Sequence, residues 1–325
     1  MKSKILLVIL SILFGSGFIL GHLSAEGQQG KSPAQPQPER DVTVNAITGI
    51  VAASAKWTPV WKETGNNADG IVAAPDGGVL AAQIDLSQIV KIDRNGKASV
   101  FLSDTHGSGS LSYDRKGNLY AGEHAPPRAI VILAPQRKTV ADTFNDKPLT
   151  DIGSPNDLVA DSKGGAYFTL GQVYYAAPSG KIIQLSQNMH TNGIVLSRDD
   201  KTLYVTNGAT IVAFDIQPDG MVANQRELGK FEGGGNGDGM TIDSEGRLYI
   251  STNPGVQILS ADGKYLGMIP TPRGIISVCF GGPHKKALYI VGNGSKDASG
   301  QEVTGRSRTI YRLPMLAQGY KNRSK

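Results

Sequence analysis

The sequence has little of what would support several common protein classes. Its 325 residues contain one cysteine, Cys279, so no disulfide can form within the chain. Cys279 lies in the apolar run at 276–280 and is expected to be a buried strand residue rather than a nucleophile. No stretch shows the apolar periodicity of a long amphipathic helix, which disfavours an α/β fold. The 41 glycines and 17 prolines instead suit a fold with many turns.

A basic surface for nucleic acid is also missing. The formal net charge is +5, but Lys2 and Lys4 lie in a candidate targeting segment, and charges of both signs are interspersed along the rest of the chain. The one short basic run, at 321–325, is not interleaved with aromatic residues. We therefore expect a small-molecule ligand and no nucleic-acid partner.

The N-terminal segment has the layout of an export signal. Within residues 1–25, Lys2 and Lys4 precede an apolar run at 5–20, and small residues follow at 24–25. An uncleaved membrane anchor is the alternative, although two glycines make the run short for a stable span. We expect an exported protein, periplasmic or secreted, that meets a membrane only through such an anchor.

Three further segments follow. Residues 26–40 are polar and rich in Gln and Pro, which predicts a disordered tether. Residues 41–318 are expected to form one folded domain, and residues 319–325 a basic tail.

One hairpin unit recurs along the domain. In the copy at 237–250, a polar residue and Gly lead into a short apolar run, a turn built on Asp and Gly follows, and a second apolar run begins at Leu-Tyr. The residues at the Leu-Tyr position of the six copies are Leu80, Tyr120, Tyr167, Tyr204, Tyr249 and Tyr289. A period of roughly 40 residues with several short strands is typical of a β-propeller. We predict an all-β, six-bladed β-propeller.

A propeller must protect the edges of its first and last blades. Residues 41–65 contain two apolar runs, at 42–54 and 56–61, which are predicted to supply outer strands that pair with 309–315 and close the ring. A capping strand outside the ring is the alternative.

The residues that enter the first strand of each copy lie eleven residues before the Leu-Tyr position, or twelve in the fourth and sixth copies, where one extra residue is expected in the turn. They are Asp69, Gly109, Asn156, Asn192, Asp238 and Ser277. A single Asp-Gly or Asn-Gly pair is usually a turn signal. Here four of the six positions carry a carboxylate or amide oxygen, and a propeller would bring all of them to one end of its channel.

Such a ring predicts a divalent cation. Two carboxylates 4 Å apart repel by roughly 4 kcal/mol at an effective dielectric near 20, and a cation between them removes this cost. Carboxylate and amide oxygens favour calcium, with magnesium or manganese next. Zinc is a weaker alternative, because the five histidines are scattered without the spacing of zinc ligands.

Several ordered motifs resemble one family. They are Ser-Pro-Asn-Asp at 154–157, Thr-Asn-Gly-Ile at 191–194, Asp-Gly-Met at 238–240 and Phe-Gly-Gly-Pro at 280–283. Together they resemble the senescence marker protein (regucalcin), gluconolactonase and luciferin-regenerating enzyme family. Glu-His at 123–124 followed by Arg128 is most similar to its bacterial gluconolactonases. The resemblance implies a six-bladed propeller with a divalent metal in the channel mouth and hydrolysis of sugar lactones.

The same resemblance implies the metal ligands. Asn192 and Asp238 match two family ligands, Asp69 stands where the family has Glu, and Asn156 matches an Asn beside the metal or the substrate. Asp238 is then the candidate catalytic residue, which positions or deprotonates the attacking water. Asp69 is one methylene shorter than Glu, so it is expected to reach the ion through a water or a shifted loop.

Two further residues are candidates for substrate binding. His124 and Arg128 could hold substrate hydroxyls, with a solvated loop as the alternative. The segment at 170–172 also departs from the family pattern, which predicts a reshaped channel mouth.

Three functions stay open on the sequence. The favoured one is a metal-dependent hydrolase that opens a sugar lactone or similar cyclic ester. Asp69 and the segment at 170–172 also fit an exported propeller that binds a small ligand or partner without catalysis. The third is a propeller of the paraoxonase or strictosidine synthase type. The former uses histidines at the channel mouth, and His190 is the candidate here.

Overall fold

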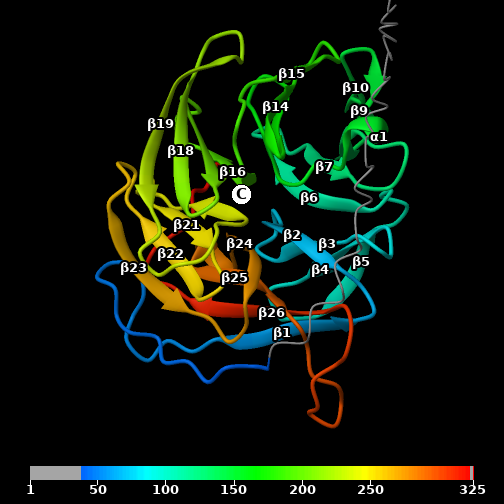
Figure 1. The fold of residues 1–325 in the computed structure, drawn as a ribbon. Coiled ribbons are helices and arrows are strands. Elements are labelled where there is room, and N and C mark those ends of the chain that lie inside the picture. The colour runs from blue at the N-terminus through cyan, green and yellow to red at the C-terminus, as the bar shows by residue number, and fades with distance from the viewer. Residues whose placement is uncertain (1–37, 323–324) are drawn as a thin grey trace, which may run out of the picture. The chain divides into compact units, whose positions relative to one another are not determined.

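The structure is a computed structural model, and it describes residues 38–322 and 325 (Figure 1). The predicted export signal at 1–25 and most of the predicted tether lie outside the described residues. Within the described part, strands dominate, and the single α-helix is the short α1 (Leu149–Ile152). No helix in this part has the length and apolar character needed to cross a membrane.

Six four-stranded antiparallel sheets make up the fold. The first three are β2 (Ala68–Ala73), β3 (Val79–Gln83), β4 (Gln88–Ile92) and β5 (Ala98–Leu102); β6 (Ser108–Tyr113), β7 (Leu119–Glu123), β8 (Ile130–Ala134) and β9 (Lys138–Ala141); and β12 (Leu158–Ala160), β13 (Ala166–Leu170), β14 (Gln172–Ala176) and β15 (Ile182–Gln184). The next two are β16 (Thr191–Leu196), β17 (Thr202–Asn207), β18 (Thr210–Ile216) and β19 (Val222–Lys230); and β20 (Met240–Ile242), β21 (Leu248–Ser251), β22 (Gly255–Leu259) and β23 (Tyr265–Pro270). The sixth is β24 (Ile275–Gly281), β25 (Ala287–Asn293), β26 (Ser307–Pro314) and β1 (Thr58–Thr64). A two-stranded ribbon, β10 (Thr143–Phe144) and β11 (Lys147–Pro148), precedes α1.

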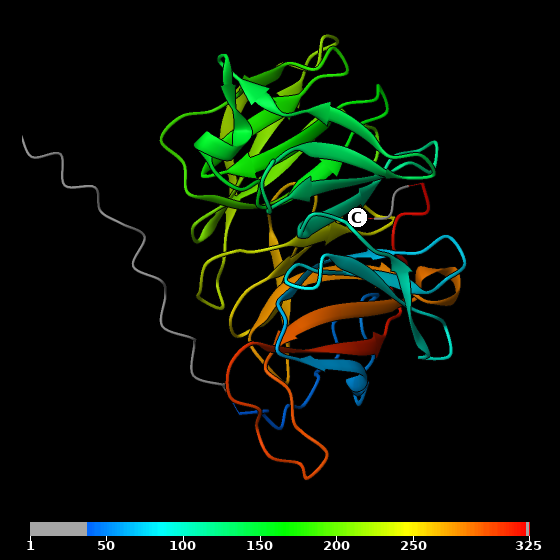
Figure 2. The ribbon, with the colours of Figure 1, turned by 90° about the vertical axis from the view of Figure 1, so that its right-hand side faces the viewer.

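The first strands of the six sheets form a closed ring. β2 packs against β6 and β24, β6 against β12, β12 against β16, β16 against β20, and β20 against β24. Each sheet therefore radiates from a shared axis as a blade, which Figures 1 and 2 show from two directions. All six Leu-Tyr positions fall in the second strands of the blades. The prediction of a six-bladed β-propeller is confirmed.

An N-terminal strand closes the ring. β1 pairs antiparallel with β26, so the sixth blade takes its outermost strand from the beginning of the domain. This confirms the prediction for the apolar run at 56–61. The run at 42–54 forms no blade strand: it makes one isolated bridge, between Ile47 and Val51, and so corresponds to the capping alternative.

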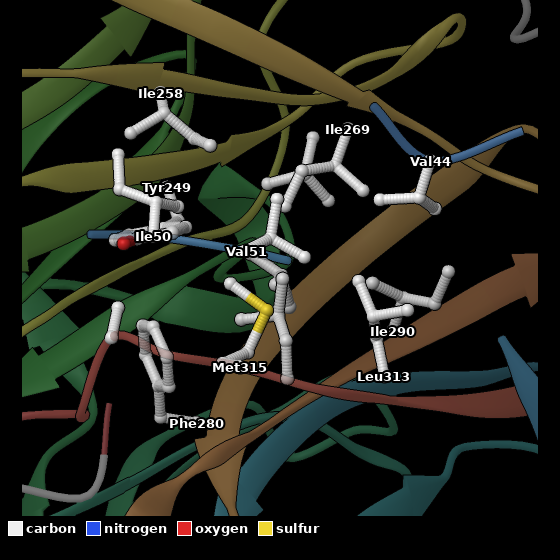
Figure 3. Close-up of a cluster of buried hydrophobic side chains, with 14 of the residues drawn as sticks. Val44, Ile50, Val51, Tyr249, Ile258, Ile269, Phe280, Ile290, Leu313 and Met315 are labelled. Atoms are coloured by element: carbon white, nitrogen blue, oxygen red, sulfur yellow. The ribbon is translucent and has the colours of Figure 1, made fainter. Parts of the chain in front are cut away.

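The capping segment packs over blades five and six. Val44, Ile50 and Val51 are buried in one cluster with residues such as Tyr249 and Leu313 (Figure 3). Burying apolar side chains of this size contributes about 1.5–3 kcal/mol each. Docking of the chain begins two residues before the predicted boundary, since Glu39 forms an ion pair with Lys296 at 2.9 Å.

The core lies between neighbouring blades. Val72 and Leu80 of the first blade, for example, pack with Leu111 and Leu119 of the second. Because inner strands are covered on both faces, they read as near-continuous apolar runs rather than as an alternation. Cys279 is fully buried in β24, and burial raises the pKa of its thiol, as expected for a structural residue.

A candidate cation and substrate site at the channel mouth

The entry positions of the inner strands face the channel. In β2 every residue except Asp69 is buried, and in β16 every residue except Asn192. Asn156 and Asp238, just before β12 and β20, are partly exposed as well. Four polar side chains from four blades therefore meet the solvent at the same end of the inner strands.

The sixth entry position is Ile276, and the prediction of Ser277 is wrong. Cys279 pairs with Tyr289 in the sixth blade, as Val72 pairs with Leu80 in the first. The turn of the sixth blade therefore has two residues more than that of the first, whereas the sequence alignment assumed one. Ile276 is also the one partly exposed residue of β24. The ring therefore has an apolar side chain at this position.

The glycines that follow the entry residues allow neighbouring blades to approach closely. A Cβ added to Gly193 would lie 2.0 Å from the Asp238 carbonyl oxygen, and one added to Gly70 would lie 2.7 Å from that of Gly109. Neither space admits a side chain. The Asn-Gly and Asp-Gly pairs at these sites do not mark turns. Their glycines leave room for the backbone of the adjacent blade, so the entry residues of neighbouring blades lie close together.

The backbone at the mouth is anchored by hydrogen bonds. The Asn156 amide donates to the Thr169 carbonyl at 2.7 Å, and the Thr169 hydroxyl donates to the Asn192 carbonyl at 2.5 Å. The Asp238 amide donates to the Ser251 carbonyl at 2.8 Å.

The side chains at the mouth are almost without protein partners. Among the described residues, those of Asp69, Asn156 and Asn192 form no hydrogen bond, and Asp238 accepts one, at Oδ1 from the Gly239 amide at 2.9 Å. Their oxygens are therefore open to water or to a ligand.

The acids of the site influence one another. Burial and, next, the Asp157 carboxylate raise the pKa of Asp69 to about 7, although Arg308 and Lys325 partly offset both. The pKa of Asp238 is well above its ordinary value, first because of burial and then because of Asp69 and Asp157. The three carboxylates are thus close enough to repel, and the site favours added positive charge.

The donor set at the mouth fits a hard divalent cation. No group of three His, Cys, Asp or Glu side chains in the described part of the chain is arranged to hold a metal. A cation bound here would therefore use the Asn amide oxygens together with Asp69 and Asp238. Carboxylate and amide oxygens suit calcium or magnesium rather than zinc.

His124 takes the place of the missing side chain at Gly109. A Cβ on Gly109 would lie 2.5 Å from the His124 ring, so only glycine leaves room for the imidazole. The Nε2 atom of His124 is buried without a hydrogen-bond partner in the described structure. Burial lowers the pKa of His124, and the Arg128 charge adds to this.

Arg128 holds the backbone around His124. Its Nε donates to the His124 carbonyl at 2.9 Å, and its guanidinium also donates to the Thr150 carbonyl at 2.9 Å. Arg128 therefore braces the loop against α1. Direct contact between Arg128 and a substrate stays a prediction.

Sequence reasoning missed one residue of this region. Asp157 braces two blades, since its carboxylate accepts from the Leu158 amide at 2.9 Å and from the Ile194 amide at 3.1 Å. The ammonium of Lys325, assigned on the sequence only to a basic tail, forms an ion pair with Asp157 Oδ1. No local sequence pattern connects residues 157 and 325.

A cleft lies at the opposite end of the inner strands. This cleft of about 830 Å³ is lined by turn residues such as Asp76, Arg115 and His284. A strand rises about 3.3 Å per residue, so Ala74 in this cleft lies about 17 Å along the chain from Asp69. The cleft is therefore separate from the site at the mouth.

The fold and the channel-mouth site together define the class of this protein. An all-β ring of six blades whose channel mouth presents carboxylate and amide oxygens is a propeller with a polar axial site. Residues 101–293 match the SMP-30/Gluconolactonase/LRE-like region, and the chain belongs to this family.

Individual relatives are distant. The chain is 24% identical to a gluconolactonase from Zymomonas mobilis, over 85% of both chains. Among solved structures it is similar to a gluconolactonase from Xanthomonas campestris, with a TM-score of 0.69, 21% identity, and coverage of 88% of this chain and 99% of the other. It is also similar to the calcium-binding protein regucalcin from Agrobacterium tumefaciens, with a TM-score of 0.61, 14% identity, and coverage of 78% and 91%. The structural likenesses support the fold.

Proposed function

We propose that this protein is a metal-dependent lactonase that opens a sugar lactone or a similar cyclic ester. The observation that carries the proposal is the set of channel-mouth oxygens, on four blades, that have almost no protein partners. Membership of the SMP-30/gluconolactonase family and the similarity to a gluconolactonase support the reaction class.

Asp69, Asn192 and Asp238 would hold the cation, with Asn156 at the edge of its site. When bound, the cation polarises the ester carbonyl and offsets negative charge that develops there. Calcium is the first choice because of the oxygen donors, and the likeness to a calcium-binding protein supports it. Magnesium and manganese are the alternatives.

Asp238 would act on the attacking water. Its Oδ1 is fixed by the Gly239 amide, while Oδ2 accepts no hydrogen bond from the described residues. That free oxygen can orient a water molecule and accept its proton.

His124 would orient the substrate. Its lowered pKa keeps the imidazole neutral near pH 7, so Nε2 can donate to or accept from a hydroxyl group of the lactone. Arg128 fixes the backbone of His124 and so helps to position the ring. Ile276 would supply an apolar wall on the other side of the mouth.

The test is hydrolysis of D-glucono-1,5-lactone by the purified protein, followed with a pH indicator before and after chelation. The proposal expects turnover that the chelator abolishes and calcium restores. Turnover that is indifferent to chelation would contradict the metal dependence. Calcium binding without turnover of glucono-, galactono- or pentonolactones would favour a binding protein instead.

Export is part of the proposal and depends on residues 1–25 alone. We expect the protein in the periplasm or the medium of its host. Cell fractionation with an antibody to the propeller would test this, and recovery in the cytoplasm would contradict it.

A further inference from the structure

Lys325 is a buried cation in the interior of the propeller. Its side chain is 3% exposed, and its Nζ forms an ion pair with Asp157 Oδ1 and donates to the Leu158 carbonyl at 2.8 Å. Figure 1 marks the C-terminal end of the sequence near the centre of the ring of blades. A lysine is almost never buried unless it is paired, so the location calls for a specific role.

Residues 319–321 lie at the other end of the channel. Gly319 bridges to Asp243, and the Tyr320 amide donates to the Ile242 carbonyl at 3.3 Å, where β20 ends. Lys321 is exposed and lines the cleft at the turn face. Lys325 nevertheless contacts Asp157, one residue beyond Asn156 at the mouth.

Asp157 ties this cation to the proposed site. Its other carboxylate oxygen accepts from the Ile194 amide, two residues after Asn192, so Asp157 joins two of the strands that carry the proposed ligands. Asp157 is itself 8% exposed and carries a charge beside Asp69 and Asp238. Without Lys325 this carboxylate would be buried with no cation in contact.

We propose that Lys325 is a built-in counter-ion of the acidic cluster, which neutralises Asp157 and thereby lowers the affinity of the channel mouth for a divalent cation. The ammonium holds the acids together before a cation arrives and repels the cation when it binds. The proposal depends on the cation site proposed above, but not on the reaction.

The test compares the wild-type protein with Lys325→Met, which keeps the length of the side chain and removes its charge. In calcium titrations by calorimetry, we expect Lys325→Met to bind about tenfold more tightly, because one repulsive charge is gone. In excess chelator its Tm should fall by about 5 °C, because Asp157 is left unpaired. Lys321→Met, on the exposed part of the tail, is the matched control and should change neither quantity.

A second pair guards against a variant that does not fold. Asp157→Asn and Asp157→Asn/Lys325→Met differ only in the ammonium, and the double variant should again bind calcium more tightly. Equal calcium affinities with and without Lys325 in both backgrounds would overturn the proposal. If the wild-type protein binds no calcium, both the proposed cation site and the effect of Lys325 on its affinity are wrong. A Tm loss specific to Lys325→Met would then support only a stabilising ion pair between Lys325 and Asp157.

Discussion

The two ends of the inner strands use acidic residues differently. At the turn end, four aspartates each accept, at one Oδ, the amides two and four residues further on; they are Asp93, Asp114, Asp161 and Asp243. At the mouth, Asp69 accepts no hydrogen bond from the described residues, and Asp238 accepts one. Hydrogen-bond satisfaction therefore separates the structural acids at the turn end from the candidate functional ones at the mouth.

The fifth blade contains both kinds of acid within six residues. Asp243 is fully buried and also accepts from the Arg247 guanidinium at 2.6 Å and from the Tyr249 hydroxyl at 3.0 Å. Asp238 has no such partners. Substitutions at these two positions should therefore have opposite effects on activity and stability.

Asp238→Asn should cause the largest loss of function. The variant keeps the shape of the side chain but loses its basicity and one ligand charge, so we expect kcat/KM for lactone hydrolysis to fall by about 10³-fold. The Tm in chelator should be unchanged or higher, because one repulsive charge is removed. Activity within tenfold of the wild-type protein would contradict the role of Asp238.

Asp243→Ala should cause the largest loss of stability. Its removal takes this acceptor from a partly buried guanidinium, a buried hydroxyl and two turn amides, which we expect to cost about 3 kcal/mol in the free energy of unfolding. Denaturant titration measures this value. The folded fraction should keep its lactonase activity. A loss of kcat in fully folded protein would contradict a purely structural role for Asp243.

The metal-free protein should lose stability as the pH rises. The pKa of Asp69 is about 7 in the folded protein, above its ordinary value, so the folded state binds more protons than the unfolded state between about pH 4 and 7. The stabilisation is complete below about pH 4 and disappears as the pH passes 7. Because the channel is partly open to solvent, we expect about 1–2 kcal/mol from this residue.

Thermal unfolding in chelator across this pH range gives the measurement. Asp69→Asn should flatten the decline, and calcium should raise the Tm most at the high-pH end. A Tm that rises steadily from pH 4 to 7 in chelator would have the wrong sign for this account.

His124→Gln should have a smaller effect. It removes the neutral imidazole over Gly109 without adding charge, so we expect KM to rise about tenfold while kcat changes little. Steady-state kinetics on the lactone separate the two constants. A fall in kcat with an unchanged KM would instead indicate a role in the chemical step.

His190→Ala should have the smallest effect. His190 is exposed, and its amide donates to Asn207 Oδ1 at 2.8 Å, an interaction that the substitution keeps. Activity should stay within about twofold of the wild-type value. Loss of activity would favour the histidine-based mechanism left open on the sequence.

Much of the fold could be predicted because each copy of the sequence repeat corresponds to one blade. The turn built on Asp and Gly and the Leu-Tyr pair mark the same hairpin in each blade, so the number of blades follows from the number of copies. The run at 42–54 was harder, because its apolar residues fit a cap as well as a strand. The strand β14 was also missed as a separate element, since Gly171 forms a one-residue turn between Leu170 and Gln172.

The candidate site was only partly predictable. Asn192 and Asp238 could be predicted from the repeat, because each precedes a glycine at the entry to a first strand. Ile276 was missed because two extra turn residues shift the count in the last copy. The His124 ring over Gly109 and the contact between Lys325 and Asp157 depend on tertiary packing, which no local spacing records.

Anomalous scattering from a crystal soaked in manganese tests the central claim most directly. The account predicts one strong peak at the channel mouth, about 2.0–2.6 Å from oxygens of Asn192 and Asp238, with Asp69 bound to the ion directly or through a water. A mouth without a peak, in crystals that bind the ion elsewhere or not at all, would contradict the cation site and the lactonase built on it.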